Sequence, residues 1–241
     1  MSLLVALGLA LAAPQSPAVA GAVVQVQSKE GGASEIQQKK DPLGDELTEG
    51  FNLIHAGKPA DAMAIFDKVI AAEQDQNRNE KRLIFSARSM TEAILYAGLG
   101  ASKKKDAVVL DGTWSGAYFG KGFALIDLGR PDEAKAWFDK AIDLAPMNAQ
   151  FLAERGEWFK SRRDWADAYA DFETASTAAE FAPDEAKSFE QRRAWRGMAF
   201  ARTEQGKLDE ARQLLQKCLK LDATDDKCQH ELQYVNGLKG N

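Results

Sequence analysis

The segment Gly129–Gln150, GRPDEAKAWFDKAIDLAPMNAQ, decides the fold of this chain of 241 residues. Small residues alternate in it with one large aromatic side chain, Phe138, and Pro146 closes the run before a second helical pattern begins. Glycine ends a helix readily, alanine permits two helix axes to approach closely, and proline stops a helix. The order of these residues therefore predicts two helices that pack tightly against each other.

The same spacing recurs along the chain. With Ser115 as position 1, positions 4, 8, 11, 15, 20, 24, 27 and 32 hold Tyr118, Gly122, Leu125, Gly129, Ala134, Phe138, Ala141 and Pro146. This unit resembles the tetratricopeptide repeat at every signature position. A second unit begins 34 residues later, at Ala149, and departs from the family at Arg163 and Glu180, which replace glycine at position 15 and proline at position 32.

The resemblance implies an all-α fold, a right-handed α-solenoid of about five helix pairs over residues 43–241. Units start near positions 43, 81, 115, 149 and 192, and a capping helix at 225–238 closes the series. A single unit cannot bury its own apolar face, so stacking of several units is required for stability.

Two units are expected to differ in length from the others. The unit at 81–114 is degenerate, because Gly100 and Lys104 stand where alanine and an aromatic residue are expected. We expect a long first helix at about Asn79–Leu99 and a short second helix that ends near Leu110. The excess residues before position 192 are expected to extend the first helix of the last unit backwards to Pro183.

The N-terminal residues 1–20 have the pattern of a secretory signal peptide. They contain no charged side chain, and the apolar run Leu3–Ala13 is followed by Ala18-Val19-Ala20, a small-x-small motif that predicts cleavage after Ala20. The alternative is a buried or disordered apolar tail, since a run of 11 residues is too short to span a membrane. The next segment, 21–42, is rich in Gly, Gln, Ser and Lys and is expected to be flexible. We therefore expect an exported protein of a bacterial-type periplasm.

Composition and motifs argue against nucleic-acid binding and catalysis. The net charge is −5 and the charges of both signs are mixed, whereas a nucleic-acid partner requires a basic patch. The two histidines, His55 and His230, lie in the first repeat and in the cap, far apart in a solenoid. The sequence shows neither a nucleophile set, nor a phosphate-binding loop, nor metal-ligand spacing. We expect no enzyme activity, no cofactor and no metal.

The two cysteines are candidates for a disulfide. Cys218 is at position 27 of the last unit, on the side that meets the next helix, and Cys228 is the third residue of that helix. An exported protein resides where disulfides persist. The alternative is two reduced thiols that pack as small apolar side chains.

The resemblance implies that the first helices of the units line a concave face, at positions 2, 5, 9, 12 and 13. The candidate partner-binding residues are Leu47, Phe51, Ile54, Phe119, Phe123, Ile126, Arg193, Arg196 and Phe200, with Gln150, Ala153, Glu157 and Lys160 on the intervening unit. The groove is therefore apolar in its early part and charged in its late part. It does not match the Lys, Asn and Arg set with which chaperone-binding members of the family hold a carboxylate.

An exposed apolar groove usually receives an extended or helical segment of another protein. The sequence thus favours a non-enzymatic interaction scaffold or assembly factor with a protein or peptide partner. A homo-oligomer and, more remotely, an accessory domain of an enzyme are the alternatives. A further alternative is that residues 21–42, or the long helices, cover the groove within the same chain.

Overall fold

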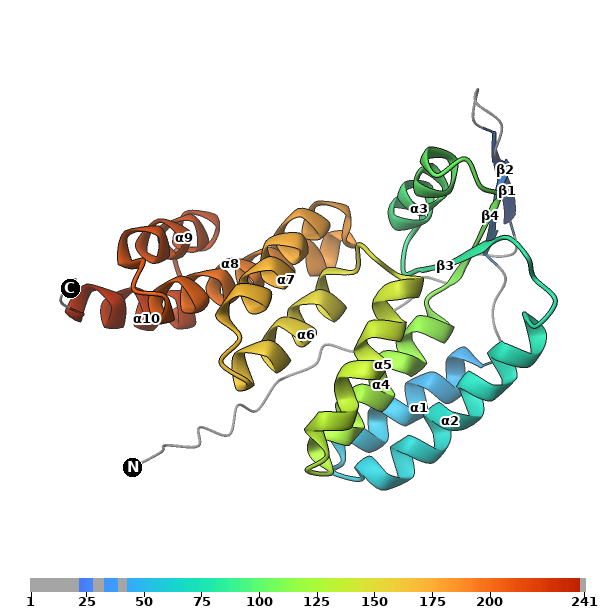
Figure 1. Ribbon diagram of the computed structural model, residues 1–241, viewed down its shortest axis with the longest axis horizontal. Coiled ribbons are helices and arrows are strands. Elements are labelled where there is room, and N and C mark those ends of the chain that lie inside the picture. Colours follow the sequence, from blue (N-terminus) through green and yellow to red (C-terminus); the bar gives the residue numbers. More distant parts are fainter. Residues whose placement is uncertain (1–21, 28–32, 39–42, 239–241) are drawn as a thin grey trace.

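The structure, a computed structural model, describes residues 22–27, 33–38 and 43–238 (Figure 1). The predicted signal peptide, 1–20, lies outside the described residues. The α-solenoid predicted from the repeats is confirmed: helix pairs follow one another in a row that ends at the C-terminus, and a small sheet stands beside the other end. In the described residues, none of the helices is both long enough and apolar enough to cross a bilayer.

Four helix pairs and a final helix make up the described solenoid, whereas five pairs were expected. The pairs are α1 (Gly44–His55) with α2 (Pro59–Gln76), α4 (Thr113–Asp127) with α5 (Pro131–Leu144), α6 (Ala149–Ser161) with α7 (Trp165–Ala178), and α8 (Asp184–Glu204) with α9 (Leu208–Leu221). A short 3-10 helix, η1 (Ala179–Phe181), separates α7 from α8, and α10 (Asp226–Gly237) follows α9. Helix α8 is the longest and begins directly after Pro183.

The aromatic residue at position 24 explains why the units stack at this spacing. The ring of Phe172 lies against Gly156 of its own unit, and a methyl group added at Gly197 of the next unit would overlap the same ring. Phe66 is placed in the same way between Gly50 of its unit and Gly120 of α4. Each ring is fully buried and fills the space left by two glycines. The packing of these rings therefore fixes the spacing between the aromatic residue and the glycines of the repeat.

The turn inside each pair has the same backbone geometry. Gly57, Gly129 and Gly206 have φ values of 69°, 72° and 75°, which only glycine adopts without steric cost. Arg163 occupies the equivalent position after α6 with a φ of 59°. Arginine thus adopts the left-handed conformation that the repeat requires, although it lacks glycine's freedom to do so.

The expected helix pair at 81–114 is wrong. Residues 83–111 instead form β3 (Leu83–Ala87), α3 (Met90–Ser102) and β4 (Ala107–Asp111), and β3 pairs with β4 in parallel. The physical reason is that LIFSA and AVVLD are short apolar runs, the second rich in β-branched valine, and such runs favour buried strands. Helix α3 packs on these strands, with the ring of Phe85 stacked on that of Tyr96.

The expectation of a flexible 21–42 is also corrected for the part that is described. Residues 22–27 and 33–38 form β1 (Ala22–Gln27) and β2 (Ala33–Gln38), an antiparallel pair. Strand β2 continues the sheet by pairing in parallel with β4, so the strand order is β1-β2-β4-β3. Ile36 is buried in the core of this sheet, and its burial stabilises the attachment of the segment.

The strand-helix-strand segment 83–111 is an insertion beside the solenoid, since α2 and α4 pack directly on each other. It is anchored to the C-terminal half of the chain. The Tyr96 hydroxyl accepts a hydrogen bond from the Met147 backbone N–H at 3.3 Å, just before α6. The guanidinium of Arg88 donates to Glu92 and to Glu190 of α8, both at 2.6 Å. The insertion is therefore held to the segment before α6 and to the N-terminal half of α8.

Candidate functional site on the inner face of the solenoid

The inner face is formed by the first helix of each pair, α1, α4, α6 and α8, and by α10. In its early part the candidate groove residues are largely packed. Phe119 is 1% exposed, and its ring lies 4.7 Å from that of Phe151 and 5.9 Å from that of Phe138. Ile54 is buried as well. The prediction that these two side chains line an open groove is wrong, because the aromatic core between α4 and α6 encloses Phe119.

Four other early candidates are half-buried rather than free: Leu47, Phe51, Phe123 and Ile126. Leu47 lies against Gly116 of α4, where an added methyl group would come within 2.9 Å of its side chain. The rings of Phe51 and Phe66 lie 5.3 Å apart. These residues connect the first two helix pairs, and their side chains are only partly accessible to solvent.

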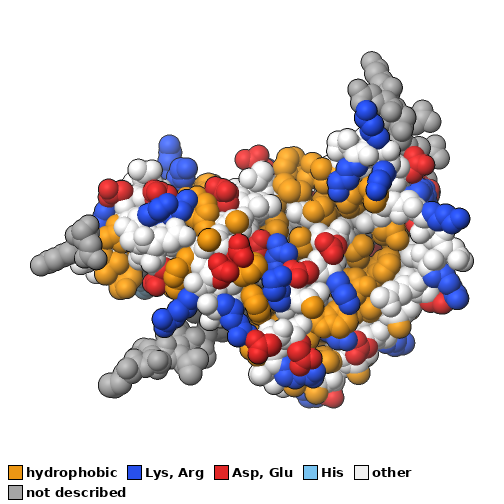
Figure 2. Space-filling model, viewed as in Figure 1, with side chains coloured by type: hydrophobic (Ala, Val, Ile, Leu, Met, Phe, Trp, Pro, Cys, Tyr) orange, Lys and Arg blue, Asp and Glu red, His pale blue; other side chains and the backbone are white. Residues whose placement is uncertain are grey.

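The late part of the inner face is charged, as the sequence predicts, but its cations are occupied. Arg193 is buried and donates to Glu154 of α6 at 2.6 Å, so it is a core ion pair and not a groove residue. Arg196 pairs with Asp225 at 3.3 Å. Removal of either partner would leave an unpaired charge away from water, which is costly. Over the face shown in Figure 2, cations and anions are interspersed on the described surface.

An accessible cleft lies at the C-terminal end of the inner face, between α8, α9 and α10. We call it the α8–α10 cleft. Its volume is about 290 Å³, and the side chains that line it include Phe200, Glu204, Leu215, His230, Glu231 and Tyr234. Tyr234 is 62% exposed and Phe200 37%. Of the predicted groove residues, Phe200 is the one that lines this cleft and remains exposed.

Helix α6 lies beside the cleft and contacts it through Lys160. The ammonium of Lys160 lies 4.2 Å from the centre of the Phe200 ring, a cation–π contact, and 2.9 Å from a Glu157 carboxylate oxygen. Lys160 is thus already engaged by a ring and a carboxylate. The contact shows that the Phe200 ring accommodates a lysine ammonium group on its face.

Glu231 is the unusual titratable group of the cleft. Burial raises its pKa to about 7, and the nearby Glu157 and Asp225 act in the same direction, against Arg196 and Lys160, which lower the pKa. Glu231 lies on the packed side of α10, between Cys228 and Val235. The sequence reasoning missed Glu231 and Tyr234. The sequence does contain a signal for Glu231: it is an acidic residue on the helix face that otherwise carries Cys228, Leu232 and Val235.

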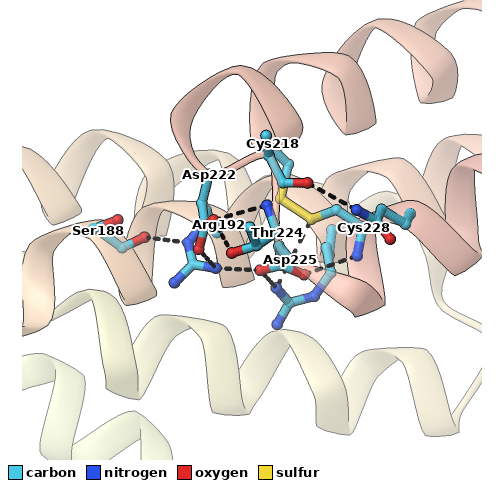
Figure 3. The surroundings of a disulfide bond; sticks show 10 residues. Ser188, Arg192, Cys218, Asp222, Thr224, Asp225 and Cys228 are labelled. Carbon is cyan, nitrogen blue, oxygen red and sulfur yellow. Dashed lines mark hydrogen bonds and ion pairs between the residues drawn. A yellow bond between two sulfur atoms is a disulfide. The ribbon is translucent and has the colours of Figure 1, made fainter.

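The disulfide predicted between Cys218 and Cys228 is present (Figure 3). Both residues are fully buried, and their Cα atoms lie 6.3 Å apart. Asp225 is the N-cap of α10 beside it: one carboxylate oxygen accepts from the Cys228 backbone N–H at 2.8 Å, and the other pairs with Arg192 and Arg196. The bond and this cap together fix α10 on α9.

The two sulfurs and the Asp225 carboxylate lie close enough together to be compared with a metal-binding set. The sulfurs are bonded to each other, and the carboxylate is shared by two guanidinium groups. Metals bind thiolates, which this oxidised pair does not supply. The chemistry of these donors therefore fits a structural cap rather than a metal centre.

The two histidines lie where the sequence placed them, at opposite ends of the row of helices. His55 is exposed in the last turn of α1, and His230 lines the α8–α10 cleft. Their separation leaves neither with the other as a partner in acid–base chemistry.

Comparisons with known proteins agree with the repeat geometry. Tetratricopeptide repeat family models match residues 115–148 and 193–225. No curated protein matches the sequence. Among solved structures, pilF of Pseudomonas aeruginosa superposes with a TM-score of 0.56 at 16% identity, over 80% of this chain and 67% of that one. MamA of Desulfovibrio magneticus RS-1 superposes with a TM-score of 0.51 at 17% identity, over 81% of this chain and 84% of that one. At these identities the likeness concerns the fold alone.

Proposed function

Because the chain is a tetratricopeptide repeat protein, we propose that it is a non-enzymatic interaction scaffold that binds a segment of another protein at the α8–α10 cleft. The observation that carries the proposal is the combination of a cleft with two exposed aromatic side chains, Phe200 and Tyr234, at the end of the inner face. In protein interfaces, exposed aromatic side chains in a concave site often supply a large part of the binding free energy.

The early part of the inner face is a weaker candidate for the same role. Its aromatic side chains pack on one another, and Phe119 is enclosed. A partner segment would have to displace this core to reach them, at the cost of opening close-packed contacts. The proposed site therefore moves from Phe119 and Phe123 to Phe200 and Tyr234.

We extend the proposal to an exported location in a bacterial-type cell envelope, where the protein would serve as a scaffold or assembly factor. Two observations support it: the signal-like composition of residues 1–20 and a buried disulfide, a bond that persists in oxidising compartments. Amino-terminal sequencing of the protein from its native cell is expected to start at Gly21. A chain that retains Leu3–Ala13 would contradict export by this route.

Site-specific photocrosslinking tests the binding site. A photoreactive benzoylphenylalanine in place of Tyr234 is expected to give adducts with a second protein in the native cell extract. The control is the same replacement at Phe189, a residue of α8 that is 48% exposed and does not line the cleft. Equal labelling from both positions would contradict the proposed site, and adducts with a second copy of this chain alone would identify self-association instead.

A further inference from the structure

Glu231 is a half-buried acid of the α8–α10 cleft. In the described part of the chain, none of the side chains or backbone donors lies within hydrogen-bond or ion-pair distance of its carboxylate, yet it lines the α8–α10 cleft. Partial burial of a carboxylate that has no cation in contact is unfavourable, because the group loses part of its hydration. The cleft therefore presents a carboxylate that has no cation in contact in the described part of the chain and that a partner's side chain can reach.

The nearby cations do not pair with the Glu231 carboxylate, because each has another partner. Lys160 is paired with Glu157 and rests on the Phe200 ring. Arg196 is paired with Asp225, which is also held by Arg192. Both cations act on Glu231 from a distance, and they do not neutralise it.

The other walls of the cleft suit a long side chain with an aliphatic stem. Leu215 and Val235 are buried at its floor, and Phe200 and Tyr234 stand at its rim. A second carboxylate, that of Glu204, also lines it. Lysine and arginine combine an apolar stem with a terminal cation, and both interact favourably with aromatic faces.

We propose that the α8–α10 cleft binds a lysine or arginine side chain of the partner segment, with Glu231 as its counter-charge and Phe200 and Tyr234 against its stem. This inference rests on the proposed function and adds the chemical class of the ligand. An acidic partner is disfavoured, because Glu204 and Glu231 line the cleft while the nearby cations are already paired.

The proposal predicts a pH dependence of binding. The free protein must release the proton from Glu231 to bind a cation, because the pKa of Glu231 is raised to about 7 by burial. Binding is therefore expected to be roughly tenfold tighter at pH 8 than at pH 6. The groups that face Glu231 are Arg196 and Glu204 of α8, Lys160 and Glu157 of α6, Asp225 before α10, and His230 on α10 itself. His230 is the neighbour of Glu231 in the sequence and also lines the cleft, so His230→Asn is the control and is expected to retain the pH dependence.

The test begins with selection of a phage-displayed library of random peptides on the immobilised full chain at pH 8. Selected peptides are expected to share a lysine or arginine. One such peptide and its norleucine isostere, which keeps the stem and removes the charge, are then titrated against wild type, Glu231→Gln and Glu173→Gln. Glu173 is an exposed residue of α7 and gives the charge-matched control.

The expected result is a loss of at least tenfold in affinity for either change alone, norleucine in the peptide or Glu231→Gln, without a further loss when both are combined. Glu173→Gln is expected to bind like wild type. Selected peptides that lack basic residues, yet weaken with Tyr234→Ala and Phe200→Ala, would overturn this inference and leave the proposed function standing. Failure to select peptides, or peptides insensitive to both aromatic substitutions, would overturn the proposed function itself.

Discussion

At the scale of single residues, the turn after α6 shows how strictly the repeat fixes the backbone. The hydrogen bond from the Asp164 N–H to the Phe159 carbonyl matches that from Arg130 to Leu125 in the preceding unit. The chain thus makes the same turn whether glycine or arginine stands at the left-handed position. The φ angle of Arg163 is 59°, and in this left-handed conformation its Cβ causes a steric cost that glycine avoids.

Replacement of that arginine by the residue usual in the family is expected to be stabilising. Arg163→Gly removes the Cβ from the left-handed conformation and should raise the free energy of unfolding by about 1 kcal/mol. Urea denaturation monitored by circular dichroism measures it. The reciprocal change, Gly129→Arg, is expected to be destabilising by a similar amount. A lower midpoint for Arg163→Gly would show that its side chain contributes more than the backbone costs.

Glu231 links stability to pH at the same scale. Its pKa is raised by burial from 4.5 to about 7, so the folded protein holds a proton that the unfolded chain releases. The stability contributed by this group is complete below pH ~4.5 and falls as the pH rises to ~7, by about 2 kcal/mol. Glu231→Gln is expected to remove this fall. Parallel stability curves of variant and wild type between pH 5 and pH 8 would contradict the effect.

At the scale of elements, α10 makes few packing contacts besides its disulfide. Two of its residues, Cys228 and Val235, are buried, and its contacts are mainly with α9. A short helix with so little buried surface is marginal by itself. The Cys218–Cys228 bond and the Asp225 cap supply the remaining constraint.

Loss of the disulfide is therefore expected to free α10 from α9. The double variant Cys218→Ala/Cys228→Ala should lose about 3 kcal/mol of stability, because a short loop is no longer closed in the unfolded chain. Hydrogen exchange should show faster exchange of α10 amides with little change in α4 to α7. Dithiothreitol is expected to reproduce the effect in wild type and to have none in the variant. Unchanged protection of α10 would show that packing alone holds it.

The repeat spacing predicts the four helix pairs, because the glycine, alanine and aromatic positions carry the packing themselves. It fails at 83–111, where extension of the 34-residue period assigned helix to LIFSA and AVVLD. The apolar residues there are consecutive rather than spaced at a helical period, which favours strands. The spacing also could not distinguish an accessible aromatic from an enclosed one. Phe119 is buried by Phe151 of another unit, a contact that only the three-dimensional stack reveals.

At the scale of the whole molecule, Arg88 joins parts that are distant in the sequence. It follows β3, pairs with Glu92 of α3 and reaches Glu190 at the start of α8, 102 residues away. Both carboxylates are nearly inaccessible to solvent. The insertion and the C-terminal half are thus coupled through one guanidinium group.

Removal of that guanidinium is expected to weaken both parts together. Arg88→Met leaves two buried carboxylates unpaired and should cost about 3 kcal/mol, seen as a lower Tm and as faster hydrogen exchange in both α3 and the start of α8. The control is Arg78→Met, whose pair with Asp75 is exposed and worth under about 1 kcal/mol. An effect confined to α3 would show that the bridge to Glu190 carries no coupling.

The cross-link at the end of the solenoid also determines how the chain responds to mechanical force. Tension applied at the C-terminus travels along α10 to Cys228, crosses the sulfur–sulfur bond and enters α9 at Cys218. The residues between the two cysteines, Asp225 among them, bear none of the load. A protein pulled from this end would unravel α10 only as far as Cys228, and the force would then act directly on α9 at Cys218.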